Sequence, residues 1–95
     1  MKVSFDYDHT LTLMRIQLIA RERVKQGDDV YIISARRNPE PIYRIADSLG
    51  IPHSRIFATG SNVEKIKKVK ELGIDMHFDD NPSVIKLLDG VGRQV

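Results

Sequence analysis

Two aspartates near the start of the chain are of a residue type, and at a spacing, that could bind a divalent cation. Asp6 and Asp8 stand two residues apart, where a short apolar run ends at Phe5. In an extended backbone, residues two apart point to the same side, so their carboxylates lie close together and repel each other. A divalent cation relieves such repulsion. An acidic turn after a strand is the simpler interpretation of this segment taken alone.

A calcium-binding EF-hand loop also begins with carboxylates at alternate positions. Such a loop requires Gly at its sixth position and Glu at its twelfth. Counted from Asp6, those positions hold Leu11 and Gln17. The sequence therefore excludes an EF-hand.

Size and composition set limits on the kind of protein. The 95 residues suffice for one domain, residues 1–95, with a modest core. The absence of cysteine excludes disulfides, thiolate zinc sites and cysteine nucleophiles. No apolar stretch is long enough for a signal peptide or a membrane span, so we expect a cytoplasmic protein without membrane contact. The net charge of +2 does not indicate nucleic-acid binding.

Short apolar runs alternate with longer helical patterns along the chain. This order is typical of parallel strands joined by helical crossovers. We therefore expect an α/β fold, a three-layer Rossmann-like parallel sheet of four to five strands with flanking helices. The predicted strands are 2–5, 29–33, 55–58, 74–78 and an edge strand at 91–95, and the predicted helices are 11–26, 41–49, 62–72 with Ser61 or Asn62 as cap, and 81–88.

Polar side chains follow several of these predicted strands. Open α/β sheets bind ligands beyond the carboxyl ends of their strands. Asp6 and Asp8 follow the first strand, Ser34 follows the second, and Asp79 and Asp80 follow the fourth. We expect these groups to meet at one edge of the sheet. Each alone also has a structural interpretation, as a turn residue, a strand-end hydroxyl or a helix cap.

One lysine on the helix at 62–72 is placed to join them. The predicted buried stripe of this helix is Val63, Ile66, Val69 and Leu72. Lys67 and Lys68 point away from that stripe, and Lys70 flanks it at the end remote from the edge. Lys65 flanks the stripe in the first turn, so it is the lysine expected to face the acids.

In order along the chain, these residues resemble the motifs of the haloacid dehalogenase superfamily. Its phosphatases carry Asp-x-Asp-x-Thr, then Ser or Thr, then Lys, then paired acids, and the resemblance spans nearly the whole chain. His9 departs from it, because the family most often has Gly at this position. The matching residues are Asp6, Asp8 and Thr10, then Ser34, then Lys65, then Asp79 and Asp80.

The resemblance implies a chemical role for each residue. Asp6 would be the nucleophile that forms an aspartyl-phosphate, and Asp8 would protonate the leaving oxygen and then activate water. Mg²⁺ would be held by Asp6, by Asp8 through its backbone carbonyl, and by Asp80. Ser34 and Lys65 would contact the phosphoryl oxygens. Asp79 would bind a metal-bound water or Lys65, and Thr10 would support the loop.

Members of this family often carry a cap domain inserted after the first or second motif. Predicted helices, strands and turns account for the 23 residues from Leu11 to Ile33 and for the 30 residues from Ala35 to Glu64. We therefore expect no cap domain and a site open to solvent.

The helix predicted at 11–26 carries two apolar stripes. Leu13, Ile16, Ala20 and Val24 suit the sheet, whereas Leu11, Met14 and Leu18 lie opposite. The second stripe fits either a partner subunit, which gives a homodimer through Met14 and Leu18, or packing under the last helix.

Together, the motifs predict an Mg²⁺-dependent phosphatase that hydrolyses phosphomonoesters through an aspartyl-phosphate. The substrate is a phosphorylated molecule, small or macromolecular, and Ser34-Ala35-Arg36 resembles the second motif of family nucleotidases and polynucleotide phosphatases. Arg36 or Arg37 would contact substrate. The alternatives are a phospho-accepting regulatory module or an idle phosphate-binding module. We assign His53 and His77 to structure, because they show no zinc-ligand spacing.

Overall fold

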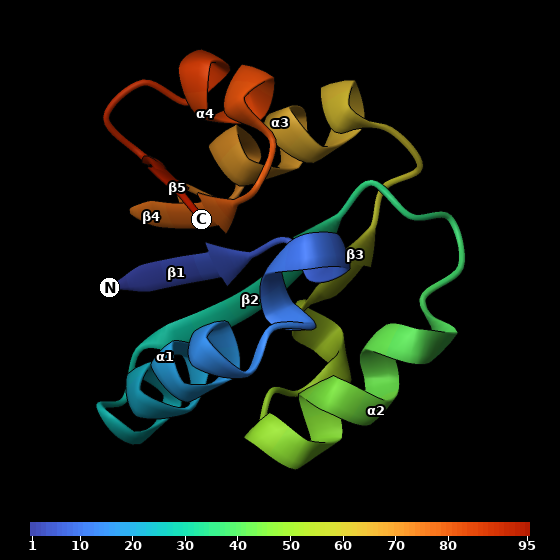
Figure 1. Cartoon of the computed structure of the whole chain (residues 1–95), viewed down its shortest axis with the longest axis vertical. Helices are drawn as coiled ribbons and strands as arrows, with labels where there is room; N and C mark the ends of the chain where they lie inside the picture. The colour runs from blue at the N-terminus through green and yellow to red at the C-terminus, as the bar shows by residue number, and fades with distance from the viewer.

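The computed structural model describes all residues, 1–95, and contains one five-stranded sheet whose strands are all parallel (Figure 1). The spatial order β3-β2-β1-β4-β5 places the first strand at the centre. This confirms the α/β class and the predicted edge strand. The strands are β1 (Lys2–Phe5), β2 (Asp29–Ser34), β3 (Ile56–Ala58), β4 (Met76–Asp79) and β5 (Gly92–Gln94).

Helices cover both faces of the sheet and so form the outer two of three layers. Helices α1 (Met14–Lys25) and α2 (Glu40–Leu49) contact each other on one face, and α3 (Asn62–Glu71) and α4 (Pro82–Leu87) contact each other on the opposite face (Figure 1). Two short helical turns, η1 (Tyr7–Leu11) and η2 (His53–Arg55), complete the connections. None of the helices is both long and apolar enough to cross a membrane.

Local signals in the sequence account for several element ends. The Ser61 hydroxyl accepts a hydrogen bond from the Glu64 amide at 3.1 Å and caps α3. Asn81 caps α4 in the same way, directly before Pro82. Gly50 ends α2 in the left-handed conformation, with φ of 76°.

Two predicted boundaries are wrong by a few residues. Helix α1 begins at Met14, not at residue 11, because residues 7–11 form a tight turn that carries the chain away from β1. Strand β4 begins at Met76, not at residue 74, because the Ile74 amide still bonds back to the Val69 carbonyl after α3.

Two apolar clusters lie on the two faces of the sheet. The cluster under α1 and α2 has 11 buried residues, including Phe5, Ile32 and Ile42. The cluster under α3 and α4 has only five, including Val69 and Val84. Most of the apolar burial that stabilises the fold is therefore on the α1/α2 side.

Three predicted helix positions differ from the structure. Val63 is 68% exposed, because the first turn of α3 lies at the carboxyl edge, where Lys65 occupies the inward position. Leu11 is fully buried in the larger cluster, because it belongs to the turn before α1 and not to that helix's outer face. Leu13 is partly exposed at the same junction.

The outer face of α1 carries an exposed apolar surface. Met14 is 70% exposed and Leu18 is 55% exposed. Helix α4 lies on the other face of the sheet, so packing of this stripe under the last helix is excluded.

No inserted domain interrupts the fold. Only η1 and α1 lie between β1 and β2, and only α2 and η2 lie between β2 and β3. No inserted domain therefore covers the carboxyl edge of the sheet, which is bordered by connecting loops and the first turn of α3.

Candidate active site

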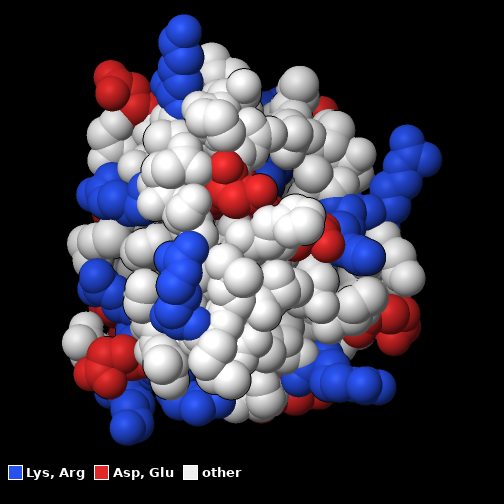
Figure 2. All heavy atoms as spheres, viewed as in Figure 1, with Lys and Arg blue, Asp and Glu red and all other residues white.

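A cavity of about 370 Å³ opens at the carboxyl edge of the sheet, between the turn after β1, the start of α3 and the connection from β4 to α4. Its lining is almost entirely polar and includes Asp6, Asp8, Asn62, Lys65, Asp79 and Asp80. Figure 2 shows a small group of acidic atoms near the centre of one face, with Lys and Arg side chains dispersed around it. Five of the sequence-predicted site residues thus line one hollow.

The turn after β1 brings Asp8 to the cavity. His9 has a φ of 57°, in the left-handed region that Gly adopts without strain. Backbone hydrogen bonds hold the turn, including Leu11 N to Asp6 O at 3.2 Å and Leu13 N to Thr10 O at 3.0 Å. The Thr10 side chain is buried and its hydroxyl has no hydrogen-bond partner, so its contribution to the turn is packing.

Lys65 occupies the centre of the site. Its Nζ lies 2.7 Å from Asp79 Oδ2 and 3.3 Å from Asp6 Oδ1, and all three side chains are less than one-tenth exposed. The other α3 lysines are elsewhere: Lys67 and Lys68 pair with glutamates of their own helix. Lys65 is thus the lysine that meets the acids, as its position on the helix predicted.

Asp79 is held by three donors. In addition to Lys65, His77 Nε2 lies 2.9 Å from Asp79 Oδ2, and the Asn81 amide donates to Oδ1 at 3.0 Å. Burial raises the pKa of Asp79, but the hydrogen bonds from His77, Lys65 and the Asn81 amide outweigh it and bring the pKa to about 2. Asp79 is therefore an ionised carboxylate.

His77 is itself fully buried on β4. Its Nδ1 lies 2.7 Å from the Ser4 hydroxyl on β1. Burial lowers the pKa of His77, in spite of the neighbouring Asp79, so the ring is neutral at pH 7.

Of the carboxyl groups in the site, Asp6 has the pKa that lies furthest from its ordinary value. Burial raises its pKa to about 7; the positive charge of Lys65 opposes this rise and the negative charge of Asp79 adds to it. A carboxyl group in this state gains strongly from any additional positive charge.

The acids form a group that suits a cation. Ligand atoms of Asp6, Asp79 and Asp80 all lie within 4.8 Å of one another. The Lys65 ammonium pairs with Asp6 and Asp79 but not with Asp80, so the three carboxylates, when all are ionised, exceed the positive charge in contact with them by two. Since Asp79 already accepts from three donors and no protein donor contacts the Asp80 carboxylate, Asp6 and Asp80 are the better placed ligands. The donor set is all oxygen, which suits Mg²⁺.

Of the remaining predicted residues, Asp8 lines the cavity, whereas Ser34, Arg36 and Arg37 are not among its lining residues. The Asp8 side chain is about half exposed, outside the three-acid group, and its Oδ2 lies 3.5 Å from Arg36 Nε. The Arg36 guanidinium also covers the Tyr7 ring, 5.6 Å from its centroid. Ser34 is buried, with its Oγ accepting from the Arg36 amide at 3.1 Å, while Arg37 is exposed and has no ion pair. Of the two arginines, Arg36 is the one beside the site.

Sequence reasoning missed two residues of this region. Asn62 lines the cavity from the first turn of α3, and the sequence suggested only a capping role for it. His77 precedes Asp79 by two residues, so both point to one face of β4 and touch. That alternation was the available signal.

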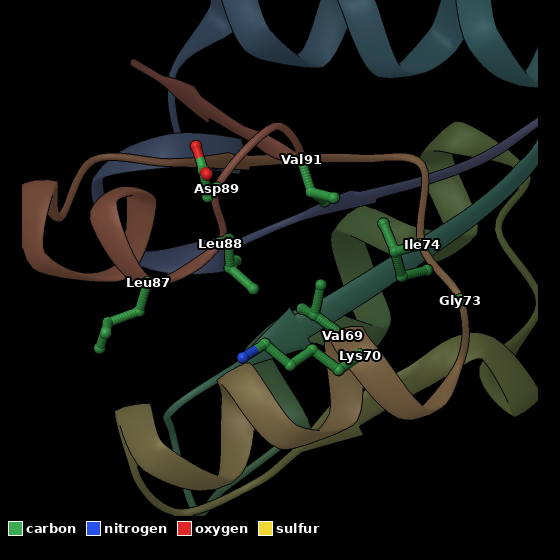
Figure 3. Close-up of a pocket in the computed structure, with 8 residues that line it drawn as sticks. All are labelled: Val69, Lys70, Gly73, Ile74, Leu87, Leu88, Asp89 and Val91. Atoms are coloured by element: carbon green, nitrogen blue, oxygen red, sulfur yellow. The ribbon is translucent and has the colours of Figure 1, made fainter.

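A second cavity of about 370 Å³ lies between α3 and α4 (Figure 3). Its walls are mainly aliphatic, including Val69, Ile74, Leu88 and Val91. Lys70 and Asp89 are its only charged lining residues. This hollow lacks the converging acids that define the first cavity.

No protein-family model matches this chain, and no curated protein matches it. The chemistry of the first cavity is therefore the guide to function.

Proposed function

We propose that this protein is an Mg²⁺-dependent phosphatase that hydrolyses phosphomonoesters through an aspartyl-phosphate on Asp6, as a minimal, capless member of the haloacid dehalogenase superfamily. One observation carries the proposal. A buried carboxylate, Asp6, lies beside a buried lysine and inside a group of acids at the carboxyl edge of a parallel sheet. A cation-assisted phosphoryl transfer uses each of these groups.

The cation site in this proposal consists of Asp6, Asp80 and, by resemblance to the family, the backbone carbonyl of Asp8. Bound there, Mg²⁺ would supply positive charge that reduces the repulsion between a phosphate dianion and the Asp6 carboxylate. Lys65 supplies a second positive charge from the protein itself, and the first turn of α3 at Asn62 presents the positive end of its helix dipole to the same cavity.

In the first half of the reaction, an Asp6 oxygen attacks phosphorus and the bond from phosphorus to the leaving oxygen breaks. Asp8 gives its proton to that oxygen, so an alcohol departs. Lys65 and the Ser34 hydroxyl stabilise the phosphoryl oxygens as their negative charge spreads.

In the second half, water attacks phosphorus while Asp8 takes up its proton. The bond between Asp6 and phosphorus breaks, which releases inorganic phosphate and restores both carboxyl groups. Asp8 is more exposed than Asp6 and pairs only with Arg36 at the surface of the site, which suits a group that must reach both the leaving oxygen and water.

The open cavity favours substrates whose phosphate projects from a larger body, small or macromolecular. A nucleotide or a nucleic-acid phosphate is one class, and Arg36 at the edge of the site suits its additional phosphate or sugar groups. The dispersed positive charge of the face in Figure 2 does not add a basic surface for a long nucleic acid.

The test is phosphate release from a panel of phosphorylated metabolites, nucleotides and 3′-phosphorylated oligonucleotides, with Mg²⁺ and after chelation. We expect turnover with Mg²⁺, little with Ca²⁺ and none with chelator. Full activity after exhaustive chelation would contradict the proposal. Phosphorylation without turnover would favour the regulatory alternative. If neither phosphorylation nor turnover occurred, an idle phosphate-binding module would be favoured.

The exposed surface of Met14 and Leu18 is the proposed contact of a homodimer. Light scattering on the wild type and on the double variant Met14→Glu with Leu18→Glu tests it. We expect a dimer for the wild type and a folded monomer for the variant. A monomeric wild type would rule the dimer out.

A further inference from the structure

We propose that His77, supported by Ser4, is a positioning residue of the reaction: it fixes the Asp79 carboxylate, and through Asp79 it holds the Lys65 ammonium beside the nucleophile. This inference rests on the proposed function, but the contacts on which it is based are independent of it.

The two central strands place these residues in matched rows. Ser4 of β1 and His77 of β4 are directly paired in the sheet register. Asp6 and Asp79 come two residues later on the same two chain segments, so all four side chains point to the α3/α4 face. The polar row thus runs from the middle of the sheet to its carboxyl edge.

The hydrogen bonds along this row have a defined direction. Both oxygens of the Asp79 carboxylate already accept, Oδ2 from the Lys65 ammonium and Oδ1 from the Asn81 amide, so His77 Nε2 is the donor in the 2.9 Å contact with Oδ2. The Ser4 hydroxyl meets the other ring nitrogen at 2.7 Å. Because Ser4 holds that side of the ring, the Nε2 proton stays directed at Asp79.

The consequence for Lys65 follows from its two unequal distances. Its Nζ lies 2.7 Å from Asp79 and 3.3 Å from Asp6, so Asp79 is its principal partner. With His77 present, Asp79 Oδ2 shares its negative charge between two donors and is fixed in orientation. Without the His77 donor, the Asn81 amide still holds Oδ1, but Lys65 is the one remaining partner of Oδ2, so Oδ2 can shift and take Lys65 with it, away from the position where Lys65 meets a phosphoryl group.

A purely structural role does not explain a histidine at this position. The residues of the five-member cluster on this face are aliphatic, and a buried polar group is no more stabilising than an apolar side chain of similar volume. A histidine whose two ring nitrogens both have partners, one of them the site's central carboxylate, is suited to orienting that carboxylate.

The experiment compares His77→Leu, which removes both ring hydrogen bonds, with His77→Gln, which keeps an N–H donor in reach of Asp79. Val69→Ala is the matched control, since Val69 is a buried aliphatic residue on the same face of the sheet and carries no group that bonds to Asp79. We expect kcat/KM to fall about 10-fold or more in His77→Leu, as for other groups that orient a functional ligand. We expect His77→Gln to recover most of it, and Val69→Ala to keep wild-type kcat/KM despite a lower Tm. Wild-type kcat/KM in His77→Leu would overturn the inference.

A second measurement separates this inference from the proposed function. In ¹⁵N spectra of the metal-free wild type, we expect His77 to carry its proton on Nε2, and we expect the Lys65 ammonium signal to move in His77→Leu but not in Val69→Ala. A proton on Nδ1 alone, or an unmoved Lys65 signal, would overturn the positioning role.

If His77→Leu does not fold, Ser4→Ala takes its place and should produce the same changes, smaller in size. Absence of any phosphatase activity in the wild type would reject the proposed function, and the spectra would still decide the placement of Lys65.

Discussion

The two faces of the sheet are covered by different kinds of side chain. The face under α1 and α2 has 11 buried apolar residues and no buried ion pair, whereas the face under α3 and α4 has five apolar residues beside a buried row of Ser4, His77, Asp79 and Lys65. Strand β1 alternates between them: Val3 and Phe5 enter the large cluster, and Ser4 points to the polar row. One strand therefore contributes to stability with one set of side chains and to the site with the other.

This difference means that stability and activity should respond to different substitutions. Changes in the larger cluster should act on the free energy of unfolding, and changes in the polar row should act mainly on turnover. The following predictions test that separation, beginning with the largest effect.

Asp6→Asn should abolish turnover, with a loss of about 10³-fold or more, because it removes the proposed nucleophile while conserving volume. The variant should stay folded, and at pH 8 it should unfold at the same or a higher temperature, because a buried negative charge is gone. Steady-state kinetics and thermal unfolding on the same preparation measure both effects. Turnover like that of the wild type would show that Asp6 is not the nucleophile.

Ile42→Ala should show the opposite pattern. Ile42 is fully buried in the larger cluster, and truncation of such a residue costs roughly 2–5 kcal/mol of unfolding free energy. Urea unfolding should report this loss, while kcat/KM of the folded fraction stays unchanged. A large fall in kcat/KM at full folding would show that the two faces are coupled.

The metal-free protein should lose stability as pH rises from 6.5 to 8. The pKa of Asp6 is raised to about 7, so folding favours its protonated form, and that stabilisation is lost as pH rises through 7. The depressed pKa of Asp79 acts only near pH 2 to 4, and the lowered pKa of His77 acts below its ordinary value of 6.5. Thermal unfolding in chelator should show the decline, and Asp6→Asn should flatten it. A wild-type Tm that rises over this range without metal would contradict the environment described for Asp6.

The smallest expected effect is at the turn after β1. His9→Gly should stabilise the protein by about 1 kcal/mol, because a left-handed backbone is strained for any residue with a side chain. For a domain of this size, that gain raises Tm by about 4–8 °C. Differential scanning calorimetry measures it, and Asn62→Gly is a control in which glycine enters a helix and should destabilise. No gain for His9→Gly would mean that its side chain stabilises the turn.

The sequence predicted the α/β class, the five strands and the edge position of the last one, because hydrophobic periodicity and helix caps act locally. It also placed Lys65 at the carboxyl edge, facing the acids, because helix geometry leaves only one lysine directed to that edge. It did not predict the exposure of Val63 or the burial of Leu11, since both depend on where the sheet ends beneath them. The row from Ser4 to Asp79 requires the pairing of β1 with β4, residues more than 70 apart, which no local pattern contains.

The most direct test of the central claim is to look for the phosphoryl group on Asp6. The protein is mixed with Mg²⁺ and a phosphorylated substrate, quenched in acid during the reaction and analysed by peptide mass spectrometry. Asp8→Asn is included because it should slow hydrolysis of the proposed intermediate. We predict one added phosphoryl group on the peptide that contains Asp6, more of it in Asp8→Asn, and none in Asp6→Asn. Turnover without any phosphorylated aspartate, or with the phosphoryl group on another residue, would contradict the mechanism.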